Sequence, residues 1–172
     1  MLKGKNIVLR PLTLSDLKKI NIWRNDLDLI RLTLGIRFPK TIELEEEWFK
    51  EILLDKSNKN IYYGIEESLS GDFIGIVQLN NIDYISRHCE FGIMIPELKN
   101  QKKGYATNAM EVLFNYALNV LNLRKICLKV VDYNKKAVKL YHNYGFKDEG
   151  LLKEQIYYDN KYHDILLMAL FI

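Results

Sequence analysis

The sequence predicts an α/β fold built on one mixed, twisted sheet with helices on both faces. Short apolar runs typical of strands alternate with longer stretches whose apolar residues recur at helical spacing. A strand–helix–strand run in the middle requires a parallel pair of neighbouring strands, because such crossovers are local and right-handed. Two apolar runs at the C-terminal end, residues 146–158 and 162–172, meet at Asp159-Asn160-Lys161, which predicts a hairpin.

Composition indicates an ordinary globular chain. Its 172 residues suit a single domain over residues 1–172, and 48% hydrophobic with 27% charged content is typical of that class. The net charge of +3 is too mild to indicate a nucleic-acid partner. We expect no membrane partner, because no signal pattern or bilayer-long apolar run is present. Cys89 and Cys127 lack metal-ligand spacing, and the histidines form no cluster, so we expect no metal and a reduced, cytoplasmic setting.

The N-terminal segment predicts a strand followed by a helix. Residues 7–12 are apolar and contain Pro11, which is typical of an edge strand. Thr13 or Ser15 then caps a helix that ends or bends at residues 24–26. Its expected inward positions are Leu14, Leu17, Ile20 and Trp23.

Two further helices precede the central strands. Residues 27–34 predict a short helix, and residues 35–39 a loop. Thr41 caps the next helix, which is amphipathic. Its expected buried positions are Leu44, Trp48, Ile52 and Leu53, and its expected outer positions are Glu43, Glu46 and Glu47.

Three strands follow, over residues 61–66, 73–79 and 88–95. Gly92 inside the third strand predicts a bulge or a close backbone contact with a ligand. In that strand one face carries Cys89, Phe91, Ile93 and Ile95, and the other carries Glu90, Gly92 and Met94.

The remaining elements are two helices and a strand. An unbroken apolar stripe predicts a helix that starts near Gly104 and ends at Asn122. Residues 125–131 predict a short strand. Asn134 opens the last helix, and Gly145 stands where a C-terminal cap belongs.

The turn over residues 100–107 has the features of an anion site. The first backbone N–H groups of a helix have no internal partner, and the helix dipole places positive charge there. Gly104 permits a close approach, Ala106 keeps the first turn uncrowded, and Lys102 and Lys103 are cationic donors suited to phosphate. Taken alone, this pattern is better explained by a solvated loop before a helix.

Two motifs in order change that interpretation. The first, Gln101-x-x-Gly104-x-Ala106, matches the Gln/Arg-x-x-Gly-x-Gly/Ala signature of the GNAT acetyltransferases. The second, Asn134-x-x-Ala137-x-x-Leu140-Tyr141-x-x-x-Gly145-Phe146, resembles the second signature of that family. The likeness runs from Leu9-Arg10-Pro11-Leu12 through residues 23–26 to the closing hairpin. This pattern resembles the branch of the family that holds ribosomal-protein and spermidine/spermine N-acetyltransferases.

The resemblance implies a GNAT acyl-CoA N-acyltransferase fold with a mostly antiparallel sheet. It implies that the strands ending near Ile95 and starting near Lys125 splay apart, with a ligand in the gap. It also implies transfer of an acetyl group from acetyl-CoA to a primary amine by direct attack. The acceptor would be a protein N-terminus, a polyamine or an amino sugar, and relatives often form homodimers.

The resemblance also assigns cofactor-binding residues. The turn takes the pyrophosphate of coenzyme A, and one residue departs from the family there, because Lys102 replaces a common second glycine. Asn134 has a structural alternative as a helix cap. The implied residues are Ile93, Met94 and Ile95 for the pantetheine arm, with Gln101, Lys102, Lys103, Gly104, Tyr105, Ala106, Thr107, Asn134 and Lys136.

Two residues are catalytic candidates. Tyr141 matches the family tyrosine that gives a proton to the leaving thiolate, and its structural alternative is a core aromatic residue. Glu90 stands on an otherwise apolar strand, where an unpaired carboxylate is costly, so it is a candidate base. Its alternative is an ion pair with Arg87 or a lysine.

The acceptor side is less defined. Arg24 and Asn25 could line the acceptor cleft. Acidic residues 43–47 could meet a cationic substrate, as in the polyamine enzymes, and the alternative is a solvated helix face with a Glu46–Lys50 pair. The rival functions are a polyamine-specific acetyltransferase and a non-catalytic acyl-CoA-binding module.

Overall fold

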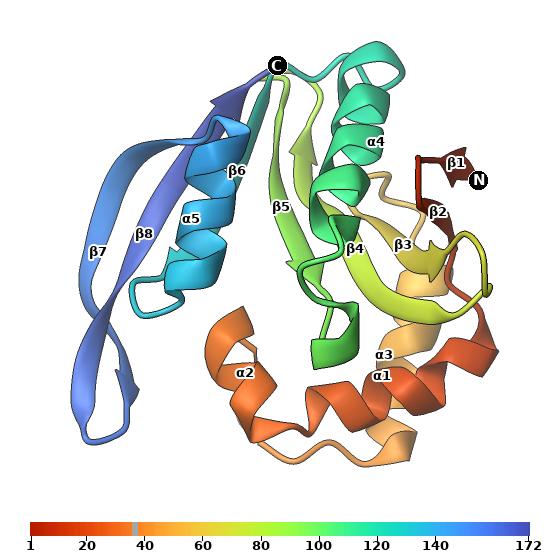
Figure 1. The fold of residues 1–172 in the computed structure, drawn as a ribbon, viewed down its shortest axis with the longest axis horizontal. Helices are drawn as coiled ribbons and strands as arrows, with labels where there is room; N and C mark the ends of the chain where they lie inside the picture. The colour runs from red at the N-terminus through yellow and green to blue at the C-terminus, as the bar shows by residue number, and fades with distance from the viewer. Residues whose placement is uncertain (36–37) are drawn as a thin grey trace.

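An eight-stranded sheet with the order β1-β2-β3-β4-β5-β6-β8-β7 forms the centre of the molecule (Figure 1). The computed structural model describes residues 1–35 and 38–172. The strands are β1 (Leu2–Lys3), β2 (Ile7–Pro11), β3 (Ile61–Glu67), β4 (Phe73–Asp83), β5 (His88–Met94), β6 (Lys125–Val131), β7 (Lys147–Tyr158) and β8 (Lys161–Phe171). The helices are α1 (Leu17–Arg24), α2 (Leu27–Thr33), α3 (Ile42–Leu53), α4 (Tyr105–Asn119) and α5 (Lys135–Tyr144), with short 3-10 turns η1 (Leu14–Asp16) and η2 (Leu98–Asn100).

The mixed sheet is confirmed, and its pairing is mostly antiparallel. Only β5 and β6 run parallel among the described strands, and α4 makes the crossover between them, as the strand–helix–strand run predicts. No helix in the described part of the chain is both long and apolar enough to cross a membrane.

Helices cover both faces of the sheet, as predicted. α4 and α5 pack on one face over a large apolar cluster, whereas α1 and α3 pack on the other over a smaller one. Strand β4 contributes side chains to both clusters, because neighbouring residues of a strand point to opposite faces. Val77 belongs to the large cluster and Ile76 to the small one. The smaller cluster contains Leu12, Leu17, Ile20, Trp23, Phe49, Phe73 and Ile76.

The N-terminal strand is not an edge strand, which corrects one prediction. The two-residue strand β1 pairs with β2, with Leu2 opposite Leu9, so β1 and β7 form the edges. Helix α1 buries Leu17, as predicted, together with Ile20 and Trp23. Leu14 lies in η1 and is 64% exposed, because a 3-10 turn advances its side chains at a different angle from the helix that follows.

The inward face of α3 was predicted only in part. Thr41 caps the helix by accepting from the Leu44 N–H at 3.3 Å, as expected. However, Leu44 is 52% exposed, and Glu45 and Phe49 are fully buried. A hydrophobicity pattern places a glutamate outside, but Arg24 on α1 pairs with Glu45 and makes its burial tolerable. The inward set is Glu45, Trp48, Phe49 and Ile52, so Trp48 and Ile52 were predicted correctly. Leu53, which was expected to be buried, is 45% exposed.

Other boundaries differ by a few residues. Helix α2 ends at Thr33, because Leu34 adopts a left-handed backbone. Part of the predicted loop at 35–39 lies outside the described residues. β4 continues to Asp83, where a loop was predicted, because its polar end still pairs with β5. Helix α4 ends at Asn119, before the predicted Asn122.

Gly92 does not form a bulge. It lies opposite Gln78 in a regular register, and the irregularity in this strand pair falls later, between Asn80 and Asp83. A Cβ added at Gly92 would stand 2.9 Å from Nε2 of Gln78. The glycine therefore makes room for a neighbouring side chain on its own sheet. A backbone contact between Gly92 and a ligand, the other expectation, stays a prediction.

The C-terminal predictions are confirmed. β6 and α5 begin and end where the sequence places them, and Gly145 closes α5 in a left-handed conformation with φ 117°. The hairpin turns at Asp159 and Asn160, which both have positive φ, as a tight two-residue turn requires.

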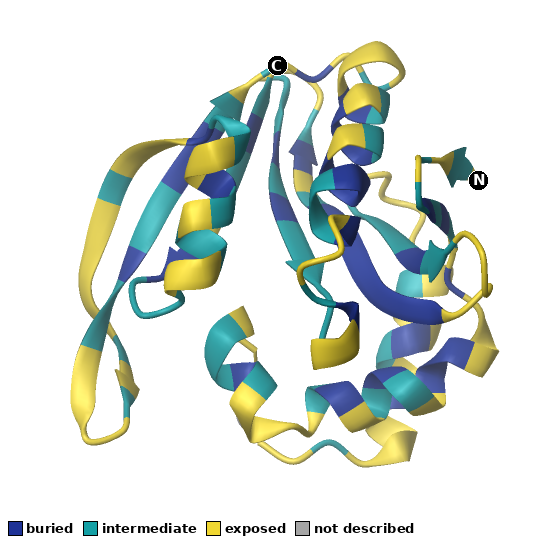
Figure 2. Ribbon diagram, viewed as in Figure 1, coloured by how far each residue is buried: buried dark blue, intermediate teal, exposed yellow. Residues whose placement is uncertain are grey.

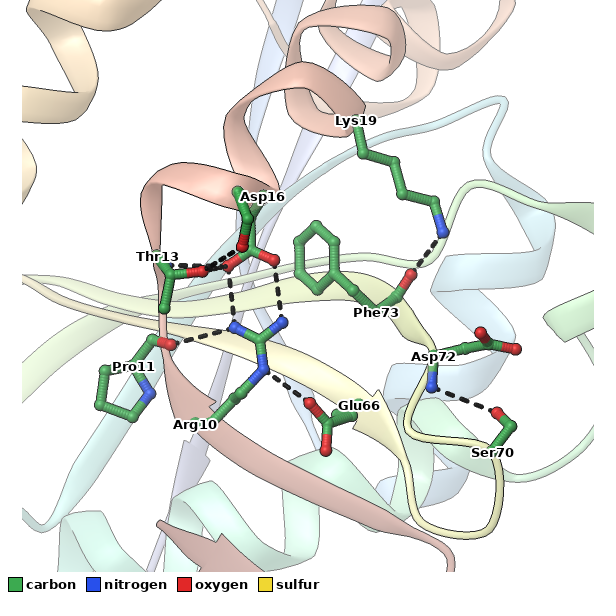
Figure 3. A network of polar contacts seen from close by, with 10 residues as sticks. Arg10, Pro11, Thr13, Asp16, Lys19, Glu66, Ser70, Asp72 and Phe73 are labelled. Carbon is green, nitrogen blue, oxygen red and sulfur yellow. Dashed lines mark hydrogen bonds and ion pairs between the residues drawn. The ribbon is translucent and has the colours of Figure 1, made fainter.

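Charged side chains fasten α1 to the sheet (Figure 3). Arg10 on β2 donates to both oxygens of Asp16 at 2.8 Å and to Glu66 at 2.7 Å. Lys19 donates to the Phe73 carbonyl at 2.6 Å. Burial alone would raise the pKa of Asp16, but hydrogen bonds from Arg10 and the Thr13 backbone outweigh it and lower that pKa.

Candidate active site

The parallel strands β5 and β6 are hydrogen-bonded over three residue pairs only. These are His88 with Lys125, Cys89 with Ile126, and Glu90 with Cys127. Beyond Glu90, β5 stays paired with β4 as far as Met94, and β6 stays paired with β8 as far as Val131. The expected splay is confirmed, and the edge of β5 over residues 91–94 faces no paired strand in the described sheet.

The turn into α4 has the backbone of an anion site. Lys102 and Gly104 both adopt left-handed conformations, with φ 60° and 77°. Gly104 is the N-cap residue of α4 and has no side chain to cap the first amides. Turn conformations of this kind gather N–H groups into a concave array that suits an anion. The first-turn amides belong to Tyr105, Ala106 and Thr107.

The side chains of this turn have different roles. Lys102 and Lys103 are exposed at the turn. The Gln101 amide donates to the Pro96 carbonyl at 3.5 Å and so folds back onto the turn. The Tyr105 ring is buried in the core beneath α4, so only its backbone can serve the turn.

Tyr141 lies at the start of the splay. Its ring is buried, and its centroid lies 6.4 Å from that of Phe91 and 5.7 Å from that of Phe146. Phe91 is the first β5 residue beyond the positions paired with β6. Burial raises the pKa of Tyr141 to about 12, so the hydroxyl keeps its proton at neutral pH. That hydroxyl makes no hydrogen bond to any residue of the described chain. The ring is core, as the structural alternative expects, but its hydroxyl is free to serve a ligand.

Glu90 occupies the last paired position of β5, on the opposite face from Phe91. Its carboxylate accepts from Lys129 at 3.1 Å, so the expected alternative of a lysine ion pair is found. Arg87, the other expected partner, binds the Asn122 carbonyl at 2.7 Å instead. Glu90 and Tyr141 therefore approach the splay from opposite faces of the sheet.

A pocket of about 190 Å³ lies beside Glu90. Its second carboxylate, Glu149, pairs with Lys125 at 2.8 Å, so each acidic group in this region holds an ammonium. The lining residues are Glu90, Cys127, Leu128, Lys129, Glu149, Leu167 and Met168.

Asn134 caps α5, as predicted, by accepting from the Ala137 N–H at 3.2 Å. Its amide group also donates to the Leu32 carbonyl at 3.3 Å, so it joins α5 to the end of α2. Lys136 is exposed on the first turn of α5. Ile93, Met94 and Ile95 are half-buried at the diverging end of β5, although Ile95 lies just outside the strand.

Arg24 and Asn25, the residues suggested for the acceptor cleft, both contact neighbouring segments of the N-terminal region. Arg24 pairs with the buried Glu45 at 3.0 Å and covers the Trp48 ring at 3.8 Å. Asn25 binds the Lys40 backbone through both ends of its amide. The acidic residues at 43, 46 and 47 are exposed, and the ion pair of α3 runs from Glu45 to Arg24 instead of from Glu46 to Lys50.

Two residues near the site were missed. Lys129 shares the sheet face of Glu90, and a parallel register predicted for β5 and β6 would have revealed it, since Cys127 lies opposite Glu90. Asn6, which contacts the turn at Lys103, left no signal, because the two are far apart in the sequence. No group of metal-ligating side chains that could hold an ion occurs among the described residues.

Comparison with known proteins gives a consistent result. A family model for the acetyltransferase (GNAT) domain matches residues 6–147. A spermidine N(1)-acetyltransferase of Vibrio cholerae serotype O1 is 34% identical over 96% of this chain and 92% of its own length. Its Escherichia coli K12 counterpart is 31% identical over 99% and 89%. The ribosomal protein uS5-alanine N-acetyltransferase of the same E. coli strain is 27% identical over 67% and 59%.

Solved structures resemble the chain over nearly its full length. The spermidine N-acetyltransferase of V. cholerae in complex with CoA and spermine has a TM-score of 0.88 at 30% identity, covering 98% of this chain and 96% of its own. A dodecameric structure of a V. cholerae spermidine N-acetyltransferase has a TM-score of 0.79 at 32% identity, covering 98% and 95%.

Proposed function

The chain belongs to the GNAT acetyltransferase family, and from this premise we propose that it transfers the acetyl group of acetyl-CoA to a polyamine. Dependence on acetyl-CoA comes with the family. The polyamine acceptor is the finer step, and one observation carries it. Spermidine acetyltransferases match the whole chain, whereas the ribosomal-protein enzyme matches about two thirds of it.

The proposed acetyl-CoA site, called the donor seat below, consists of the unpaired edge of β5 beyond Glu90 and the turn over residues 100–107. Acetyl-CoA supplies the acetyl thioester. The free edge of β5 around Ile93 and Met94, with Ile95, offers backbone groups to an extended pantetheine arm, as an added strand would use them. The turn offers uncapped amides to the diphosphate, and Lys102, Lys103 and Lys136 add cationic charge around it.

Tyr141 acts on the departing sulfur. The amine nitrogen bonds to the carbonyl carbon, the carbon–sulfur bond breaks, and the sulfur takes a proton from the Tyr141 hydroxyl. With a pKa of about 12, the hydroxyl would not protonate an ordinary thiolate in water. Burial raises the pKa of the Cys89 thiol, two residues from Phe91 on β5, to about 12 as well. Desolvation disfavours a thiolate as it disfavours a tyrosinate, so burial of the departing sulfur would make it a stronger base.

Glu90 takes the proton that the amine loses, directly or through water. The carboxylates of Glu90 and Glu149 already bind the ammonium groups of Lys129 and Lys125. A polyamine presents the same ammonium chemistry, and it can replace Lys129 beside Glu90. This match supports a cationic acceptor at the face of the sheet opposite Tyr141.

The test is an acceptor panel. We would measure thiol release from acetyl-CoA with spermidine, spermine, putrescine, a peptide with an N-terminal alanine, and glucosamine. We expect kcat/KM for spermidine or spermine to exceed that for the peptide at least about tenfold. A faster reaction with the peptide or the sugar would reject the polyamine assignment. Thermal stabilisation by CoA without acetylation of any amine would favour the rival, a non-catalytic acyl-CoA-binding module.

We also propose that the chain self-associates, although not specifically as the homodimer that the family resemblance suggests. The dodecameric structure of the V. cholerae relative supports this. Sedimentation velocity across a concentration series measures it, and a monomer at every concentration would contradict it.

A further inference from the structure

The N-terminal segment contacts the turn before α4 through Asn6. Asn6, immediately before β2, donates from its amide Nδ2 to the Lys103 carbonyl at 3.1 Å. Its backbone N–H donates to Oδ1 of Asn108, on the first turns of α4, at 3.1 Å. Asn108 is buried, and its own Nδ2 donates to Glu111 at 3.0 Å. One asparagine therefore joins the start of β2 to both the turn and the helix that the turn begins.

The position of Asn6 does not depend on the turn. Its carbonyl accepts from the Ser68 N–H at 3.1 Å, and the Gly4 N–H closes a tight turn onto the Ile7 carbonyl at 2.8 Å. A Cβ added at Gly4 would come within 2.4 Å of Oδ1 of Asn108, so the segment packs closely on α4. Asn6 is thus held by the sheet and presents its amide to Lys103.

The contact controls a peptide plane. The Lys103 carbonyl and the Gly104 N–H belong to one planar peptide unit and point in opposite directions. Glycine adopts either sign of φ at little cost, so the covalent structure leaves that plane free to turn over. With the carbonyl held by Asn6, the Gly104 N–H points away from Asn6. We propose that Asn6 is a positioning residue that aims this N–H at the diphosphate of the acyl donor, an inference that rests on the proposed donor seat.

The experiment compares Asn6→Ala with Asn115→Ala. Asn115 is an exposed asparagine on α4 whose side chain accepts a hydrogen bond from Asn119, so it makes a matched control. By calorimetry, we expect the Kd for CoA to rise about fivefold in Asn6→Ala and to stay constant in the control. The kcat at saturation and the KM for spermidine should not change. Unchanged CoA affinity in Asn6→Ala would overturn the proposal.

A truncated donor separates positioning from general damage. S-acetylpantetheine lacks the diphosphate, so its kcat/KM should be the same in Asn6→Ala and in the unmodified protein. An equal loss with both donors would indicate a structural role and reject the inference. Asn6→Asp keeps the volume but places a carboxylate oxygen opposite the Lys103 carbonyl. It should weaken CoA binding more than Asn6→Ala does, and a smaller effect would also contradict the proposal.

Gly104→Ala distinguishes a failure of the role proposed for Asn6 from a failure of the turn as the diphosphate site. Because Gly104 has φ 77°, alanine strains this turn and should weaken CoA binding if the turn is the seat. Weaker binding in Gly104→Ala but not in Asn6→Ala would reject the role of Asn6 alone. Unchanged binding in both would reject the turn as the diphosphate site. Thermal midpoints of all variants establish that each one is folded.

Discussion

Residues are buried beneath the helices on both faces of the sheet (Figure 2), but different interactions hold the two faces. Beneath α4 and α5 the core is apolar, and the rings of Phe91, Phe114, Tyr141 and Phe146 contact one another. On the other face, α1 and α3 cover a smaller apolar cluster. The polar contacts there belong to Arg10, Lys19 and Arg24, which pair with carboxylates and lie over aromatic rings.

The contrast indicates how each face positions its residues. Apolar packing is not directional, so the first face holds Tyr141 by filling space around its ring. Ion pairs and cation–π contacts depend on geometry, so the second face sets the angle at which α1 and α3 meet the sheet. Removing one partner of a buried ion pair should therefore reduce stability on the charged face, whereas removing the Tyr141 hydroxyl should reduce turnover and leave the packing of the apolar face intact.

The largest effect should come from Arg24→Met. Glu45 is fully buried, and its Oε1 has no hydrogen-bond partner in the described chain, so Arg24 supplies its only ion pair there. Removing Arg24 leaves a buried charge unpaired, which should lower the free energy of unfolding by about 3 kcal/mol. Urea denaturation measures this loss.

The control is the double variant Arg24→Met/Glu45→Met. It removes both charges, so it should recover most of the stability that Arg24→Met loses. If Arg24→Met alone cost less than about 1 kcal/mol, the pair would behave like a surface ion pair, and the contrast between the faces would fail.

Tyr141→Phe should reduce turnover with little change in stability. The ring keeps its contacts with Phe91 and Phe146, and only the hydroxyl is lost. We expect kcat to fall about 100-fold with the Kd for CoA unchanged. Tyr144→Phe is the matched control, because Tyr144 is on the same helix with its ring against Phe114. Equal turnover in the two variants would remove the proton-donor role.

The same variant tests burial through alkaline unfolding. In the folded chain the pKa of Tyr141 is about 12, above the ordinary value of 10.0. The folded state therefore holds this proton more tightly, so stability is unaffected below pH 10 and falls as pH rises from 10 to 12. Tyr141→Phe should reduce that fall by up to about 3 kcal/mol. Identical alkaline profiles would mean that the hydroxyl is solvated.

Glu90→Gln should have a smaller effect on turnover. If Glu90 is the base, kcat should fall about tenfold, because water can partly replace it. Lys129→Met removes the partner but keeps the carboxylate, so it should leave kcat near its original value. Stopped-flow or steady-state thiol release measures both variants. Equal losses of stability with no change in kcat would assign the pair a structural role only.

The smallest effect should come from Lys102→Gly. Lys102 has φ 60°, a backbone conformation that costs a residue with a side chain about 1–2 kcal/mol. Glycine removes this strain, but it loses more backbone entropy on folding, which offsets about 0.5–1 kcal/mol of the gain. We expect the free energy of unfolding to rise by about 0.5–1 kcal/mol. Lys102→Ala, which keeps the strain but removes the charge, should give no gain. A gain of equal size in Lys102→Ala would indicate that charge, not backbone strain, is relieved.

The sequence predicted the apolar face better than the charged face. The start of α4, all of β6 and α5, and the closing turn follow from local signals such as apolar periodicity, Gly145 and the Asp159-Asn160 pair. On α3 the burial of Glu45 was not predicted, because it depends on Arg24, which comes from another helix. The bulge predicted at Gly92 was wrong, because the glycine makes room for Gln78, which belongs to another strand.

The site divides in the same way. The sequence by itself determined the chemical groups, because motif spacing places Gly104 before one helix and Tyr141 inside another. Only the tertiary structure decided that Lys129 pairs with Glu90 and that Asn6 holds the Lys103 carbonyl. The physical reason is range. Helix and turn signals come from residues a few positions apart, whereas hydrogen bonds and ion pairs join groups that only the folded sheet brings within about 3 Å.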